Sequence, residues 1–232
     1  MPDTSAAPPD GRLPAIGPSR LRGPAARARR SRPLPADGRL TPAGERLLDA
    51  ASELFYLWGI HAVGVDTIAE AAGTTKKTLY DRFGSKDALV ALYLQRRAER
   101  WQAFVEAHLR DHASERVGVN AGVSRVLAVF DALEAWYAEL IRGCAFVNAY
   151  AEIGGIDHPG VAVIRAEKEW THALYVRLLT EAGVDDAALR DAVGAQLMLV
   201  HEGVSIMLTA GGRADAFDSA RTAARRLLDG VA

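Results

Sequence analysis

Two adjacent lysines stand among hydroxyl side chains in the stretch AEAAGTTKKTLYDRFGSKDAL, residues 69–89. The lysines are Lys76 and Lys77, and the hydroxyl groups belong to Thr75, Thr78 and Tyr80. Ammonium and hydroxyl groups together are what proteins use to bind phosphates and to read the edges of bases. The residue types of this stretch therefore predict contact with a nucleic acid.

The positions of the lysines in the expected helices favour the same chemistry. Lys76 and Lys77 fall in the first turn of a helix that starts after Thr75, and Lys86 falls in the first turn of the next, after Ser85. A cation there loses about 0.3–1 kcal/mol against the helix dipole. A phosphate attracts both the lysines and the helix N-termini, so the arrangement becomes favourable on DNA. The alternative is an ordinary solvated surface.

The spacing of small and apolar residues in the same stretch predicts a helix–turn–helix. Ala69 stands four positions before Gly73 and allows close approach of the two helices, while Leu79 stands six positions after Gly73 and shares an apolar contact with Ile68. Helices this short need support from their neighbours. The expected supporting residues are Leu54, Phe55, Phe83 and Leu92.

The rest of the chain beyond residue 40 also has helical spacing, so we expect an all-α protein of about nine helices. The first begins at the N-cap Thr41 with Pro42 in its first turn and ends at Gly59. Its expected buried face consists of Leu47, Ala51, Leu54, Phe55 and Trp58. Further helices are expected over 65–72, 76–83, 86–109, 123–137, 161–182, 185–209 and 217–228.

The N-terminal residues 1–40 have a different composition and predict a disordered basic tail. They hold eight of the ten prolines, and residues 1–38 hold seven arginines against three aspartates, in a chain of net charge −1. Such a tail either adds contacts to phosphates or the minor groove, or has no specific role. The chain has one cysteine, no apolar run of the ~20 residues that span a bilayer and no apolar core of a secretory signal. We therefore expect a cytoplasmic protein with no membrane partner.

The stretch GVDTIAEAAGTTKKTLYDRFGSKDAL, with the helix before it, resembles the DNA-binding domain of the TetR/AcrR family of bacterial transcriptional regulators over residues 43–92. The matching positions are Ile68, Ala69, Ala72, Gly73, Thr78, Leu79, Tyr80, Phe83, Ser85, Lys86 and Leu89. The resemblance implies a homodimer that binds a palindromic double-stranded DNA operator, usually as a repressor, and is released by a small molecule. The DNA-binding residues are then expected to be Gly64, Thr75, Lys76, Lys77, Thr78, Tyr80 and Lys86.

Three positions depart from the family pattern. Gly64 stands where a capping Ser or Thr is common, so a side-chain contact to phosphate is lost. Thr74 replaces the usual valine and brings a hydroxyl group that needs a partner. Asp81 stands where a basic residue is common and brings a carboxylate near the DNA.

Residues 93–232 are expected to form a ligand-binding and dimerisation domain. Apolar residues with polar tips predict an effector site, although aromatic residues at helical spacing also occur simply as core. The candidate lining residues are Trp101, Phe104, Trp136, Tyr137, Cys144, Asn148, Trp170 and Tyr175. The helix from 186 to 209 is apolar nearly all round and, with the last helix, is expected to pair with a second copy; the alternative is a central helix of a monomer. The expected interface consists of Val193, Leu197, Val200, Val204, Phe217, Leu227 and Leu228.

The sequence gives little support to an enzyme. His158, His172 and His201 are far apart, and no spacing typical of a metal site or a glycine-rich phosphate loop occurs. We therefore expect no catalytic residue, metal or cofactor. Two alternatives remain open: an activator or ligand-independent DNA binder of the same fold, and a helical enzyme or thiol sensor that uses Cys144.

Overall fold

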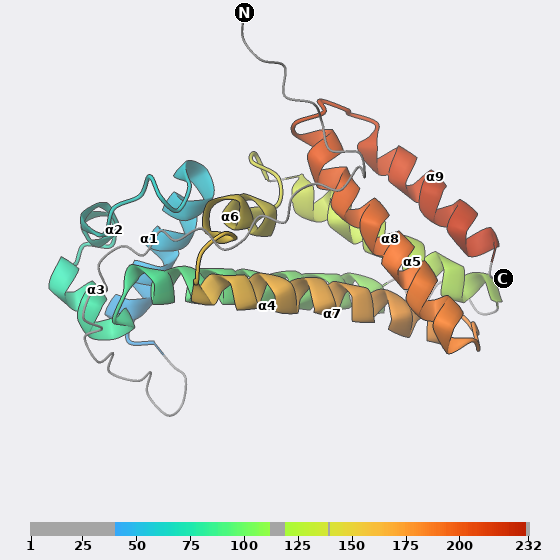
Figure 1. The fold of residues 1–232 in the computed structure, drawn as a ribbon, viewed down its shortest axis with the longest axis horizontal. Coiled ribbons are helices and arrows are strands. Elements are labelled where there is room, and N and C mark those ends of the chain that lie inside the picture. The colour runs from blue at the N-terminus through green and yellow to red at the C-terminus, as the bar shows by residue number, and fades with distance from the viewer. Residues whose placement is uncertain (1–39, 112–118, 139, 231–232) are drawn as a thin grey trace, which may run out of the picture. The chain divides into compact units, whose positions relative to one another are not determined.

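The computed structural model describes residues 40–111, 119–138 and 140–230, and within these ranges the chain forms nine α-helices and no strand (Figure 1). The all-α prediction is confirmed; the predicted tail lies almost wholly outside the described residues. None of the described helices is long and apolar enough to cross a bilayer. The helices are α1 Pro42–Trp58, α2 Val65–Ala71, α3 Lys76–Phe83, α4 Lys86–Asp111, α5 Val119–Tyr137, α6 Ala145–Ile153, α7 Pro159–Glu181, α8 Ala187–Leu208 and α9 Ala216–Asp229.

Local hydrogen bonds explain where several helices begin. The Thr41 hydroxyl accepts from the amide of Gly44 at 3.3 Å, and Ser85 Oγ accepts from Ala88 at 3.0 Å. Asp186 Oδ1 accepts from two amides of the first turn of α8. Each of these side chains satisfies a donor that the helix leaves free.

The turn between α2 and α3 depends on Gly73, whose φ of +59° lies in the left-handed region. Its amide donates to the Glu70 carbonyl at 3.0 Å, and the Thr74 amide donates to the Ala69 carbonyl at 2.9 Å. This pair of bonds is a Schellman ending of α2. Ile68 and Leu79 are fully buried on either side of it, as the spacing predicts.

The predicted buried face of α1 needs one correction. Leu47, Ala51 and Phe55 are buried, but Trp58 is 67% exposed. Trp58 is the last residue of α1, directly before the positive-φ Gly59. The chain leaves the helical path there, so the indole lies beyond the reach of the residues that cover the rest of this face.

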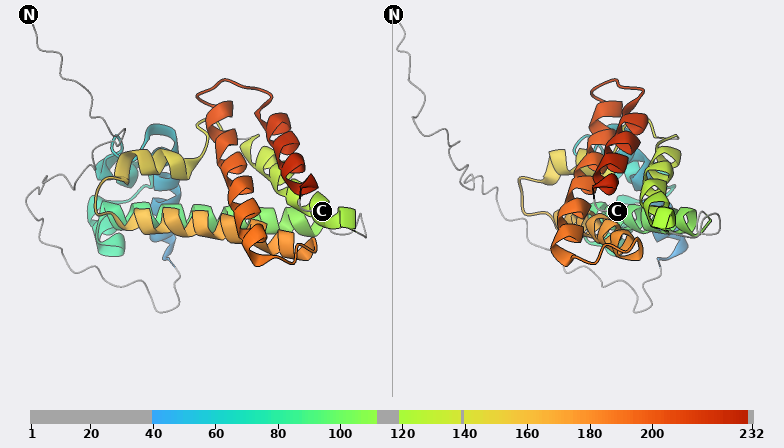
Figure 2. Two further views of the ribbon diagram at one scale, coloured as in Figure 1. Left: turned by 45° about the vertical axis from the view of Figure 1, so that its right-hand side comes forward. Right: turned by 90° about the vertical axis from the view of Figure 1, so that its right-hand side faces the viewer.

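Two sets of buried residues form the interior of the described chain. The first combines α1 to α3 and the N-terminal part of α4 with α6 and Ile164 of α7. The second combines the rest of α4 and α7 with α5, α8 and α9. Helices α4 and α7 lie side by side and contribute to both (Figures 1 and 2). The apolar packing of the helix–turn–helix therefore continues into α6, past the expected boundary near residue 92.

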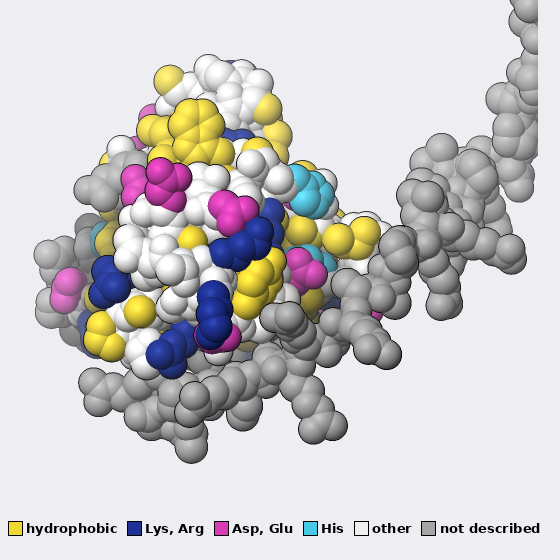
Figure 3. Space-filling model, turned by 90° about the vertical axis from the view of Figure 1, so that its left-hand side faces the viewer, with side chains coloured by type: hydrophobic (Ala, Val, Ile, Leu, Met, Phe, Trp, Pro, Cys, Tyr) yellow, Lys and Arg dark blue, Asp and Glu magenta, His cyan; other side chains and the backbone are white. Residues whose placement is uncertain are grey.

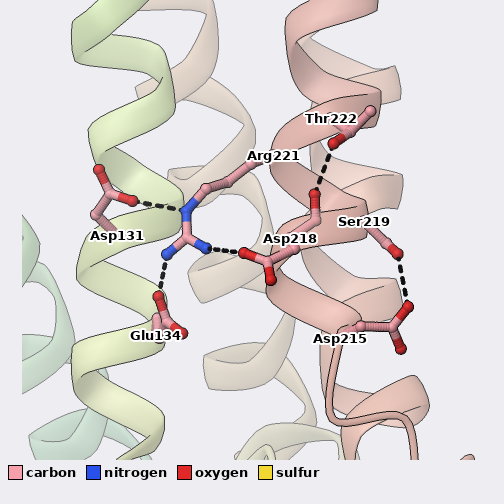
Figure 4. A network of polar contacts seen from close by, with 7 residues as sticks. All are labelled: Asp131, Glu134, Asp215, Asp218, Ser219, Arg221 and Thr222. Atoms are coloured by element: carbon pink, nitrogen blue, oxygen red, sulfur yellow. Dashed lines mark hydrogen bonds and ion pairs between the residues drawn. The ribbon is translucent and has the colours of Figure 1, made fainter.

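Arg221, which lies outside the buried apolar face of α9, links this helix to α5. Its guanidinium donates to Asp131 of α5 at 2.7 Å, to Glu134 of α5, and to Asp218 of α9 at 3.2 Å (Figure 4). The side chain is 25% exposed. Arg221 therefore bridges two helices instead of projecting into solvent.

Most of the residues expected at a dimer interface are covered within the protomer itself. Val193, Leu197, Val204, Phe217 and Leu228 are at most 7% exposed in the core of α5, α8 and α9. Val200 and Leu227 are half-buried against the same core. Helix α8 has two apolar faces, and the sequence pattern did not distinguish the inner from the outer one. The exposed apolar residues of its outer surface are Leu189, Leu199, Ile206 and Met207.

Candidate DNA-binding surface and interior cavity

The N-terminal end of α3 carries most of the residues predicted to touch DNA. The Thr75 hydroxyl accepts from the Thr78 amide at 3.1 Å and lies 3.0 Å from the Thr78 hydroxyl, so it both starts the helix and orders the side chain one turn on. Tyr80, on the same helix, is 38% exposed. Lysine and arginine side chains gather on this face of the molecule with a few acidic ones between them (Figure 3).

Both lysines of α3 are paired with carboxylates. Lys76 Nζ lies 3.0 Å from Asp66 of α2, and this bond raises the lysine pKa. Lys77 Nζ lies 2.6 Å from Asp81, one turn further along α3. All four side chains are about half exposed or more. Ion pairs this exposed contribute little to stability, so they would not prevent a phosphate from replacing either carboxylate.

Lys86 differs from the other two lysines because its side chain turns inward. Its ammonium donates to the Ile60 carbonyl at 2.6 Å and lies 5.9 Å from the centre of the Phe55 ring. Burial lowers the pKa of this lysine. Its contacts tie the start of α4 to the end of α1 and the start of the α1–α2 segment, a structural role that the sequence did not predict.

The three departures from the family pattern have different local consequences. Gly64 is the N-cap of α2 and supplies no side-chain bond there, as expected. The hydroxyl of Thr74 is buried and has no hydrogen-bond partner among the described residues, so the partner it needs is missing. Asp81 pairs with Lys77.

A cavity of about 30 Å³ lies among α4, α5, α6, α7 and α8. It is room for about one or two waters. Its apolar wall includes Trp101, Trp136 and Phe146, with the Trp101 and Trp136 rings edge to face at 5.5 Å between centres. The complete lining is Arg97, Trp101, Leu133, Trp136, Tyr137, Leu140, Cys144, Ala145, Phe146, Glu167, Lys168, His201, Glu202 and Ser205.

Charged side chains meet on one side of this cavity. Lys168 Nζ lies 2.9 Å from Glu167 Oε2 and 2.8 Å from Glu202 Oε1. Burial opposes the charge of Lys168, but nearby anionic groups outweigh it and raise the lysine pKa. Burial also raises the pKa of the Cys144 thiol, so this thiol is neutral near pH 7. At that pH it is therefore the carboxylates of Glu167 and Glu202 that raise the pKa of Lys168.

The polar residue His201 is buried beside the same cavity. Its Nδ1 lies 2.9 Å from the Tyr175 hydroxyl. Burial lowers the pKa of His201 to about 4, so the ring is uncharged near neutral pH.

Short polar links join the wall of the cavity to the end of α1. Arg142, two residues before Cys144, donates to the Tyr56 and Leu57 carbonyls at 3.1 and 2.8 Å. At the other end of α6, the Glu152 carboxylate accepts from the Ile60 and His61 amides at 2.8 and 2.6 Å. A change in the position of α6 would therefore also displace the end of α1 and the segment between α1 and α2.

Comparison with known proteins places this geometry in a family. Residues 47–93 match the family described as bacterial regulatory proteins, tetR family. An uncharacterised HTH-type transcriptional regulator of Mycobacterium tuberculosis is 30% identical over 164 residues, which cover 62% of this chain and 78% of that one. A TetR-family transcriptional regulator from Streptomyces coelicolor has a similar structure, with a TM-score of 0.70, 28% identity and coverage of 82% of this chain and 96% of that one. This chain belongs to the TetR family.

A third relative is the HTH-type transcriptional activator FasR of Mycolicibacterium smegmatis, 40% identical over 111 residues. That match covers 48% of this chain and 48% of FasR, so it spans about half the length of the relative. The TetR-family assignment makes this protein a transcriptional regulator with a DNA-binding helix–turn–helix.

Half of the residues predicted for the pocket of this TetR-family protein lie on the cavity, namely Trp101, Trp136, Tyr137 and Cys144. The other four do not. Phe104 stacks behind Trp101 and Trp136, and Tyr175 is fully buried behind His201. Asn148 donates to the Arg142 carbonyl at 2.7 Å, and Trp170 packs against the core elsewhere.

The sequence did not predict the charged residues Glu167, Lys168 and Glu202 of the cavity wall. Glu167 occupies a position in the buried stripe of α7 that continues through Thr171, Leu174 and Leu178. A carboxylate at helical spacing with buried apolar residues was the available signal. Among the described residues no group of three or more His, Cys, Asp or Glu side chains could hold a metal.

Proposed function

We propose that this TetR-family protein is a ligand-responsive repressor that binds a palindromic operator as a homodimer and is released when a small, largely apolar molecule enters the interior cavity. The observation that carries the proposal is the pair of links from α6 to the end of α1. The same short segment forms part of the cavity wall and part of the support of the DNA-binding helices.

The size of the cavity supports a coupling between ligand and structure. Ligand sites commonly have volumes of about 300–1,000 Å³. The cavity has about 30 Å³, so a ligand must displace its walls. Cys144, Ala145 and Phe146 belong to those walls and begin two residues after Arg142, which donates to two carbonyls at the end of α1. Ligand binding therefore favours an arrangement in which this support has shifted, a population shift between two states.

The outer surface of α8 supports pairing with a second copy. Leu199 is 74% exposed, and Ile206 and Met207 are 47% and 45% exposed. With Ala195 and Gly203 they form one stripe at helical spacing. A two-fold dimer would place two copies of α3 about 34 Å apart, one turn of DNA. We expect Leu199→Arg to produce monomers in sedimentation equilibrium, whereas Ile156→Arg, an equally apolar exposed residue after α6, leaves the dimer intact.

The relative FasR is a transcriptional activator, which favours a second candidate function in which operator binding increases transcription. The physical contacts with DNA would be the same. A reporter gene behind the selected operator, with and without the protein, distinguishes the two signs of regulation.

Selection from a random-sequence duplex pool tests DNA binding itself, with the wild type beside Lys77→Ala and Arg225→Ala at two salt concentrations. We expect one palindrome to be enriched, Lys77→Ala to weaken binding, and Arg225→Ala, which removes an exposed charge from α9, to have little effect. Salt-sensitive binding without an enriched sequence would instead indicate a ligand-independent architectural binder. Absence of any binding would refute the proposal.

A further inference from the structure

The buried ammonium of Lys168 occupies a site whose composition resembles a receptor for an organic cation. Two carboxylates bind it, Glu167 at 2.9 Å and Glu202 at 2.8 Å, and it lies 5.4 Å from the centre of the Phe146 ring. Carboxylates and aromatic faces are the groups that stabilise ammonium ions in desolvated sites.

One acceptor of this site is not fully used. Glu167 is 4% exposed, and its Oε1 accepts from the Thr171 hydroxyl at 3.1 Å. Its Oε2 is buried next to the Lys168 ammonium but makes no hydrogen bond of acceptable geometry to any described residue. The ion pair with Lys168 offsets part of the cost of burying this oxygen, and a ligand N–H or O–H aligned with its lone pair would add the missing hydrogen bond.

Phe146 and Lys168 also separate the cavity from an outer groove. They line both the interior cavity and an open, largely apolar groove of about 450 Å³ between α6 and α7, which includes Tyr150 and Ile164. Displacement of these two side chains would join the two spaces and leave Glu167 and Glu202 facing the combined site. The joined volume falls in the range of small-molecule sites.

We propose that this joined site binds organic cations, in which a protonated amine on an apolar, aromatic skeleton takes the place of the Lys168 ammonium between Glu167 and Glu202. The exchange keeps one cation between the two carboxylates, so neither carboxylate is left unpaired in the interior. The inference deepens the proposed function, because it names the class of effector, but ligand binding can be measured without DNA.

Arg97 defines the competing possibility of an anionic ligand. Its guanidinium reaches the cavity and stacks on Tyr56 and Trp136, at 4.8 and 5.7 Å from the ring centres. No carboxylate partner for it is present in the described parts of the chain. A ligand carboxylate would pair with Arg97 and would meet repulsion from Glu167 and Glu202.

The test compares three probes on one skeleton, 1-naphthylmethylamine, 1-naphthylmethanol and 1-naphthylacetate, by quenching of tryptophan fluorescence and by calorimetry. We expect the protonated amine to bind at least about tenfold more tightly than the carboxylate, and Glu167→Gln to weaken the amine by about tenfold with little effect on the alcohol. Thermal unfolding and circular dichroism would verify that the variant is folded. Glu202→Gln, at a more exposed position, provides the same comparison if Glu167→Gln does not fold.

Lys168→Ala provides an independent measurement, since it removes the resident cation. We expect n-propylammonium, which matches the deleted part of the side chain, to raise the melting temperature of this variant and not that of the wild type, while 1-propanol has no such effect. Equal affinity for the carboxylate and the amine, an amine affinity unchanged by Glu167→Gln, or no binding of any probe would overturn the proposal. Operator binding that persists in those cases would leave the DNA-binding function intact.

Discussion

Glu152 connects α6 to the segment between α1 and α2, and its removal should be costly. Its carboxylate accepts two backbone N–H bonds, from Ile60 at 2.8 Å and from His61 at 2.6 Å, and its side chain is 26% exposed. A hydrogen bond to a charged group contributes about 1.5–3 kcal/mol. Ile60 is buried and His61 is exposed, so we assign about 2 kcal/mol to the first bond and about 1 kcal/mol to the second. Glu152→Ala should then lose about 3 kcal/mol of unfolding free energy.

Urea denaturation measures this loss, and amide hydrogen exchange locates it. We expect exchange of the Ile60 amide to accelerate by roughly a hundredfold in Glu152→Ala, since 1.4 kcal/mol corresponds to about a factor of ten in the opening equilibrium. Glu152→Gln keeps one acceptor and should lose about half as much stability. Glu169→Ala, an exposed carboxylate of α7, is the matched control. A loss below about 0.5 kcal/mol with unchanged exchange at Ile60 would show that α6 does not hold the DNA-binding helices in this way.

Three further predictions concern single side chains. Thr74→Val removes a buried hydroxyl without a partner and should stabilise the protein by about 1 kcal/mol, seen as a higher melting temperature; a lower one would mean that a water binds the hydroxyl. Arg221→Leu should cost about 1–2 kcal/mol in urea denaturation, more at low salt than at high salt, whereas Arg225→Leu should be nearly neutral; equal effects would contradict the bridging role of Arg221. Because the pKa of His201 falls to about 4, the unfolded chain binds the extra proton first as pH drops. Stability should therefore decrease by about 3 kcal/mol between pH 6.5 and pH 4, and His201→Gln should flatten that decrease.

The sequence was most informative where local rules determine the structure. Thr41, Gly73 and Ser85 act through their own backbone neighbours, so the ends of α1 to α4 could be predicted from residue type and spacing. The bounds of helix α6 do not follow from such local rules. It has nine residues, and its N-cap, Cys144, makes no side-chain hydrogen bond, so the usual starting signal is absent.

Features that depend on packing between distant segments were less accessible. The two apolar faces of α8 look alike in sequence, and only the positions of α5 and α9 decide which is buried. Lys86 carries the same residue type as Lys77, yet its contact with the Ile60 carbonyl depends on a turn 26 residues earlier. Glu167 and Lys168 belong to α7 and Glu202 to α8, so their contact likewise depends on how two distant helices pack.

The two ion pairs on α3 have a consequence for how the protein finds its site. When Lys76 or Lys77 meets a phosphate, the ammonium must leave Asp66 or Asp81, so contact with DNA is an exchange of partners and not a simple addition. The released carboxylate then stands near the polyanion and reduces the net gain at every phosphate, whatever the base sequence. If Lys76 and Lys77 contact DNA as proposed, we expect short residence on random sequences, because the exchange reduces the gain there, while an operator adds base contacts that the exchange does not offset. The carboxylates would then shorten the time spent on wrong sequences and speed the search for the operator.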